Sequence, residues 1–100
     1  MLDSILENII FLELKRRGYN VYVGKDGDKE IDFLAEHGND RIYVQACVRL
    51  PENSNREVSN LMNIQDHYPK YVVSLDEFDM SRNGIRHRNI RDFLLADSWS

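Results

Sequence analysis

The spacing of hydrophobic and polar residues predicts one helix and then three strands in the first half of the chain. Residues 4–17 carry apolar side chains at helical spacing, with Ser4 and Glu7 as a capping box at the start and Gly18 as the stop. Residues 20–25, 29–36 and 41–49 alternate as half-buried strands do. Two-residue turn signals at 26–27 and 38–39 separate these strands, so we expect successive hairpins.

The second half of the chain predicts a helix, a strand and a last helix. Pro51 ends the third strand, and residues 54–57 open a helix that closes before Pro69. A strand follows at 71–75, and after an irregular stretch Asn89 caps a short helix. The predicted order is αβββαβα. Because a strand reached across a helix usually runs parallel to a neighbour, we expect an α/β fold with a mixed β-sheet flanked by helices.

The turn at 38–39 also fixes which residues of its two strands face each other. If those two residues form the loop, Asp32 lies opposite Gln45 and Glu30 lies opposite Cys47, all on one face. Directly opposed residues have Cβ atoms roughly 4.5–5.5 Å apart, so Asp32 and Gln45 could touch one common ion or water. An aspartate in an apolar strand costs free energy unless it is paired, hydrated or metal-bound. Asp32 is therefore a candidate site residue. The alternative is that it is an acid on the solvent-exposed face of the strand.

The segments Glu30-Ile31-Asp32 and Gln45-Ala46-Cys47 resemble the PD-(D/E)xK, or restriction-endonuclease-like, superfamily. In that pattern two carboxylates hold a divalent ion, and a lysine orients or activates the attacking water. Carried over by the resemblance, Glu7 matches the acid of the first helix and Asp32 the metal-binding acid, so we expect the Glu7 carboxylate near Asp32, Gln45 and Cys47. Gln45 matches the second acid and Cys47 matches the lysine, so the last two positions depart from the nuclease pattern. For Glu7, the capping box remains the alternative role.

A wider resemblance points to a family of bacterial and archaeal AAA-type ATPases, whose C-terminal domain of unknown function this chain is similar to. It covers nearly the whole chain and is carried by the segments 7–14, 17–23, 30–33 and 68–74. The resemblance implies a restriction-endonuclease-like fold, one domain over residues 1–100, and the N-terminal ATPase domain of the same protein as a partner. The chain has no G-x-x-x-x-G-K-[ST] loop, so we expect the ATPase upstream and this chain as a C-terminal fragment.

Gln45 and Cys47, which depart from the nuclease pattern, weaken the expected metal binding and hydrolysis. A glutamine carbonyl can ligate Mg²⁺ but brings no charge, so Asp32 and Glu30 would have to supply the charge of a weak metal site. Cys47 cannot replace a lysine ammonium, because a thiol carries no positive charge. Arg49 shares its face but is too basic to act as a proton acceptor. We therefore expect a degenerate domain that does not cleave nucleic acid.

A basic cluster near the C-terminus is the other candidate site. Its arginines are Arg82, Arg86, Arg88 and Arg91. Such a cluster could bind the phosphates of DNA. Three acids immediately precede it at positions 76, 77 and 79, so pairing between two oppositely charged surface segments is the alternative.

Composition restricts the partners. The net charge of −4 gives no general attraction to nucleic acid or to an anionic membrane, so any such binding must be local. One cysteine, no signal peptide and no long apolar run favour a cytoplasmic domain without a membrane partner. Three functions stay open: a non-cleaving nuclease-like domain that binds nucleic acid, a protein-interaction or regulatory domain of the ATPase, and an active Mg²⁺-dependent nuclease.

Overall fold

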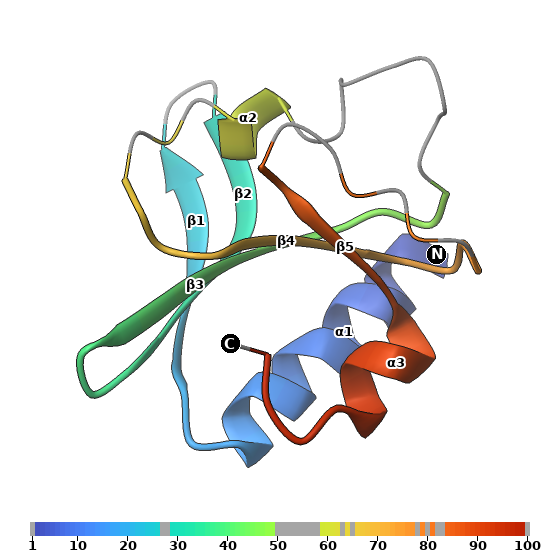
Figure 1. Ribbon diagram of the computed structural model, residues 1–100, viewed down its shortest axis with the longest axis horizontal. Coiled ribbons are helices and arrows are strands. Elements are labelled where there is room, and N and C mark those ends of the chain that lie inside the picture. The colour runs from blue at the N-terminus through green and yellow to red at the C-terminus, as the bar shows by residue number, and fades with distance from the viewer. Residues whose placement is uncertain are drawn as a thin grey trace.

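The chain folds into a mixed sheet with helices on both faces (Figure 1). The computed structural model describes residues 2–26, 29–49, 59–62, 64, 66–77, 79, 81 and 84–99, with the backbone alone at 3, 24–26, 29–31, 59 and 60. The elements are α1 (Leu2–Arg16), β1 (Asn20–Asp26), β2 (Lys29–His37), β3 (Asp40–Ala46), α2 (Ser59–Met62), β4 (Lys70–Ser74), β5 (Arg86–Asn89) and α3 (Ile90–Leu95). This order differs from the predicted αβββαβα by one additional strand, β5.

The strands lie in the order β1-β2-β3-β4-β5. The first three are antiparallel neighbours, as their short turns require, while β4 runs parallel to β3 and β5 parallel to β4. The prediction of an α/β fold with a mixed sheet is confirmed. Figure 1 shows α1 and α3 together on one face of the sheet and α2 on the other. No helix in the described part of the chain has the length and apolar character needed to span a bilayer.

Helix α1 starts earlier than its sequence predicts and ends as predicted. It begins at Leu2, so Ser4 lies inside the first turn and the capping-box prediction is wrong. At the other end Gly18 has a φ of 90°, a conformation that glycine adopts without steric cost. The Gly18 and Tyr19 N–H groups donate to the carbonyls of Lys15 and Leu14 at 3.0 and 3.1 Å. This pair of bonds is a Schellman motif, which ends the helix and turns the chain into β1.

Two apolar clusters hold the layers together, one on each face of the sheet. Alternation along β3 sends Ile42 and Val44 to the α1 face and Tyr43 to the α2 face. The cluster under α1 and α3 contains Leu6, Ile10, Leu14, Phe33, Ala35, Ile42, Val44, Tyr71, Val73, Phe93 and Trp99. The cluster under α2 contains Tyr43, Cys47, Leu61, Val72 and Ile85. The second cluster is the smaller one and lies beside the predicted site.

Strand β5 is held against β4 by a buried polar pair. The Nε2 atom of His87 lies 2.6 Å from Ser74 Oγ, and both side chains are buried. Ser74 Oγ donates to Asp76 Oδ2 at 2.9 Å, so the His87 ring donates its Nε2 hydrogen to the same hydroxyl. Buried polar groups that satisfy one another in this way cost little and specify one arrangement. A charged segment of the chain can therefore form an ordered strand.

Candidate functional site

The β2–β3 hairpin has the predicted two-residue turn and the predicted register. Gly38 lies in the left-handed region at φ 61°, and the ladder pairs His37 with Asp40 and Phe33 with Val44. One further step along this ladder places Asp32 opposite Gln45. Because opposed residues share a face, both lie on one face of the sheet, as predicted, and the structure shows that this is the α2 side.

A β-bulge marks the position of Asp32. In the β1–β2 ladder Val23 pairs with Phe33 and Gly24 pairs with Ile31, so Asp32 is the extra residue between two consecutive pairs. A bulge leaves the extra residue out of the ladder and bends its strand. The backbone N–H of Asp32 therefore needs a partner other than β1.

Asp32 and Gln45 exchange hydrogen bonds where the two strands part. The Asp32 N–H donates to Gln45 Oε1 at 3.1 Å, and the Ala46 N–H donates to Asp32 Oδ2 at 2.7 Å. Beyond the Phe33–Val44 pair, two side-chain oxygens thus accept hydrogen bonds that backbone carbonyls accept in a regular ladder. A backbone N–H bonded to a carboxylate is one of the stronger hydrogen bonds in proteins. The arrangement uses the predicted metal ligands to join β2 to β3.

Cys47 is a buried thiol in the apolar cluster under α2. Its side chain is 8% exposed, and its Sγ donates to the carbonyl of Arg49 at 2.9 Å. Its backbone N–H donates to Val73 O at 3.0 Å, which extends the pairing between β3 and β4. Arg49, the cation predicted to share this face, has a side chain that is 80% exposed and lies 4.0 Å from Asp76. No lysine ammonium stands at the position that the nuclease pattern assigns to Cys47.

The two other predicted acids of this site are Glu7 and Glu30. Glu7 is carried by α1, whose buried residues pack on the face that holds Phe33 and Val44, opposite the face of Asp32. That its carboxylate lies near the Asp32–Gln45 pair stays a prediction. The side chain of Glu30 lies outside the described residues. Among the described side chains, no three of His, Cys, Asp or Glu gather as metal ligands.

The predicted basic cluster is split by β5 and α3. Arg86 and Arg88 alternate onto one face of β5, with their guanidinium carbons 5.7 and 5.8 Å from the centre of the Tyr71 ring. Arg86 also donates to the Tyr71 hydroxyl at 3.1 Å. Arg91 lies in the first turn of α3, 3.9 Å from Asp92, and Arg82 lies outside the described residues. The cluster is therefore a pair of arginines on an edge strand, with a third on the next helix.

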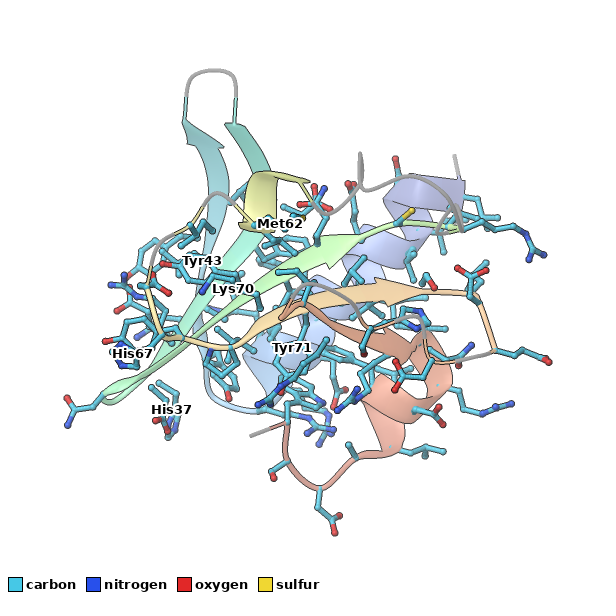
Figure 2. The ribbon with its side chains drawn as sticks, turned by 45° about the horizontal axis from the view of Figure 1, so that its top comes forward. His37, Tyr43, Met62, His67, Lys70 and Tyr71 are labelled. Atoms are coloured by element: carbon cyan, nitrogen blue, oxygen red, sulfur yellow. The ribbon has the colours of Figure 1, made fainter. Side chains whose placement is uncertain are left out.

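A cleft of about 640 Å³ opens at the other end of β3, and sequence reasoning did not find it. Three segments far apart in the chain form it: the β2–β3 turn with the start of β3, residues 67–69, and the C-terminal residues 97–99. Arg17 and Tyr19 also line it. Figure 2 shows His37 and His67 at this end of the sheet. The only sequence signal for it was the density of aromatic and imidazole rings in those segments.

The C-terminal segment is fixed in the cleft wall by Trp99. Its ring stacks on Phe93 with centroids 4.1 Å apart, and its Nε1 donates to Phe93 O at 2.8 Å. The Arg17 guanidinium lies 4.1 Å from the ring centre and also donates to Leu94 O at 3.1 Å. Trp99 is only 6% exposed. These contacts join the end of the chain to α1 and α3.

Glu13 holds Arg17 in place. Arg17 Nε lies 2.7 Å from Glu13 Oε2, and Arg16 bonds the same carboxylate at 2.6 and 3.0 Å. The hydrogen bonds from Arg16, together with that from Arg17, hold the pKa of Glu13 below its ordinary value against the opposing effect of burial. At neutral pH the carboxylate is therefore charged and keeps the Arg17 guanidinium oriented over Trp99.

A second polar group stands beside the cleft, on the α2 face. Tyr43 donates to Asp66 Oδ2 at 2.6 Å, and Lys70 Nζ bonds Asp66 Oδ1 at 2.9 Å and Tyr68 O at 2.8 Å. Figure 2 shows Tyr43 and Lys70 next to each other. Burial acts to raise the pKa of Asp66, but the hydrogen bonds from Tyr43 and Lys70 outweigh it and lower the pKa. This network fixes the segment that carries Tyr68.

Comparison with known proteins finds relatives of undefined function. An uncharacterized protein of Haemophilus influenzae is 43% identical over 91 residues, which is 90% of this chain and 22% of that protein. An uncharacterized protein of Methanocaldococcus jannaschii is 42% identical over 59 residues, which is 54% of this chain and 13% of that protein. The chain thus spans less than a quarter of each relative's length. No family model and no solved structure matches the chain.

Proposed function

We propose that this chain is a non-cleaving domain of the restriction-endonuclease-like fold. The hydrogen-bond exchange between Asp32 and Gln45 carries this proposal. A working site of that kind needs two carboxylates free to hold an ion and a cation to activate water. Here Asp32 accepts a bond from the backbone of Ala46, the residue opposite it is a neutral amide, and a buried thiol stands in place of the cation. The antiparallel meander followed by parallel strands, and the bulge at Asp32, support the fold assignment.

The role we propose for the domain is nucleic-acid binding within a longer cytoplasmic protein, an ATPase of the AAA type. Arg86 and Arg88 support it, because they extend from the same face of an edge strand. The net charge of −4 restricts such binding to this local surface. The relatives support the longer protein, since the matched region is a small part of each.

Protein docking is a second candidate function, and one surface favours it. Helix α1 exposes four large apolar side chains at 3-4-3 spacing, which places them on one stripe. They are Leu2, Ile5, Ile9 and Leu12, with exposures of 52%, 51%, 38% and 57%. Such stripes are the usual contact faces of helices that pack on a partner. In this alternative the partner is another part of the longer protein.

We expect no nicking when supercoiled plasmid is incubated with the domain and Mg²⁺ or Mn²⁺. The charge that would hold the ion and the group that would activate water are both reduced at residues 45 and 47. Gel electrophoresis measures the outcome. Metal-dependent nicking that disappears on Asp32→Ala would overturn the proposal. Titration with duplexes and single strands at low and moderate salt tests the binding role, and an absence of binding to all of them would favour protein docking.

A further inference from the structure

We infer that the cleft at the start of β3 binds one unpaired nucleobase of a single-stranded nucleic acid. The inference rests on the proposed nucleic-acid binding and adds the form of the ligand. The cleft lies at one end of β3, whereas the Asp32–Gln45 pair lies at the other, roughly 15 Å away at the usual rise of a strand. The ligand would therefore occupy a surface that the nuclease pattern does not use.

The size and the rings of the cleft suit a flat heterocycle. Its volume of about 640 Å³ falls within the range of small-ligand sites. Among the lining side chains, Tyr68 and His67 stack with ring centroids 4.5 Å apart, and Arg41 lies 5.4 Å from the Tyr68 centre. Tyr19, which also lines the cleft, lies 5.7 Å from His37. Aromatic side chains bind bases of any sequence, because every base offers a π-face.

The charges of the cleft favour a neutral polar ligand over a bare anion. Two arginines, Arg17 and Arg41, are matched by Asp40 and Asp97 among the lining residues. A phosphate alone would meet both acids, whereas the edge of a base presents donors and acceptors together. Burial and the charge of Asp40 raise the pKa of Tyr19, so its hydroxyl keeps a hydrogen to donate at neutral pH. In a duplex these edges and faces are covered, so the cleft selects single strands.

Two arginines of β5 lie beyond the cleft, across β4. Arg86 pairs with Tyr71, two residues after the cleft residue Pro69, and donates to the Tyr71 hydroxyl at 3.1 Å. Arg86 is exposed, and Arg88 follows it on the same face of β5. With the base in the cleft, the adjacent phosphates would approach these two arginines. Two phosphate contacts to a single strand predict a salt slope of about −1.4 in log affinity against log salt concentration.

The test compares four labelled probes by fluorescence anisotropy: single-stranded DNA and RNA of about eight nucleotides, the DNA duplex, and an abasic strand with the same phosphates. We expect both single strands, or one of them, to bind at least tenfold more tightly than the abasic strand and the duplex. Trp99, the one tryptophan of the chain, should report the same binding by its emission. Comparison of the single-stranded DNA and RNA probes shows which nucleic acid supplies the base.

Variants localise the binding. Tyr68→Ala is expected to weaken single-strand binding by roughly 5- to 100-fold, and Tyr68→Phe to restore most of it, because the stacking face returns. Tyr22→Ala is the matched control, since Tyr22 is an exposed tyrosine on β1 that does not line the cleft. Equal binding of the abasic and normal strands, or of Tyr68→Ala and wild type, would contradict base binding in the cleft. If the duplex still bound in those cases, the proposed nucleic-acid binding would stand without base binding in the cleft. If no probe bound, both proposals would be contradicted.

Discussion

Replacing Trp99 with alanine is expected to lower the free energy of unfolding by about 3–5 kcal/mol, as truncation of large buried aromatics does. The change removes the stack on Phe93, the contact with the Arg17 guanidinium and the hydrogen bond to Phe93 O. For a domain of this size each kcal/mol shifts the melting temperature by roughly 4–8 °C. Thermal and urea denaturation would measure the loss.

Two further variants define the cause of that loss. Trp99→Phe keeps a ring on Phe93 but lacks the N–H donor, so we expect it to lose about 1–2 kcal/mol. Leu95→Ala is the control, because this side chain is 74% exposed and its truncation should change stability by less than about 0.5 kcal/mol. If Trp99→Ala melted like wild type, the C-terminal segment would not be docked, and the cleft would lose one of its walls.

Restoring the nuclease pattern with Gln45→Glu and Cys47→Lys is expected to destabilise the domain by about 3 kcal/mol or more. The lysine would place an ammonium where a thiol that is 8% exposed now packs among apolar side chains. The glutamate would stand directly beside the Asp32 carboxylate, and repulsion of like charges disfavours that pair. Urea denaturation would measure the combined effect, and each single variant would separate its two parts.

The same double variant should respond to Mg²⁺, whereas the wild type should not. A bound cation relieves the repulsion between the two carboxylates, and a ligand that binds only the folded state stabilises it by mass action. At ten times the dissociation constant this amounts to about 1.4 kcal/mol. Thermal melts with and without Mg²⁺ measure the difference. An equal response in both proteins would mean that residue 45 does not face an ion site.

The sequence predicted the hairpin that holds Asp32 and Gln45 because its register depends on local chemistry. The two-residue turn at 38–39 needs a left-handed Gly38, and the period of two along each strand then determines every opposed pair. Gly18 and Asn89 were likewise recognised as helix ends because their caps are local. Asn89 does accept the Arg91 N–H at the start of α3, at 2.8 Å.

Features that depend on distant contacts were missed. Strand β5 reads as a run of charged residues, and its order depends on pairing with β4 and on the contact of His87 with Ser74 from that strand. The hairpin register also does not say which face of the sheet α1 covers. Its buried residues pack with Phe33, on the face opposite Asp32.

The cleft could not be predicted for the same physical reason. Its walls come from three segments, and the docking of Trp99 on Phe93 brings the last of them into place. A single tryptophan in a polar C-terminal segment was a local signal that this segment packs somewhere, but one of its partners, Arg17, lies at the other end of the chain. Within the hairpin, the sequence showed which residues meet; the bulge that turns Asp32 into a backbone acceptor appeared only with the β1 pairing.

We propose that Asp32 and Gln45 join two strands and hold no catalytic ion. A titration of the ¹⁵N-labelled wild-type domain with Mn²⁺, followed by amide spectra, tests it most directly, because the paramagnetic ion broadens the signals of nearby residues. We predict no selective broadening at Asp32, Gln45 and Ala46, and slow hydrogen exchange at the Ala46 amide, whose N–H donates to Asp32 Oδ2. Broadening centred on these three residues at low Mn²⁺ concentration, and its loss in Asp32→Asn, would contradict the account.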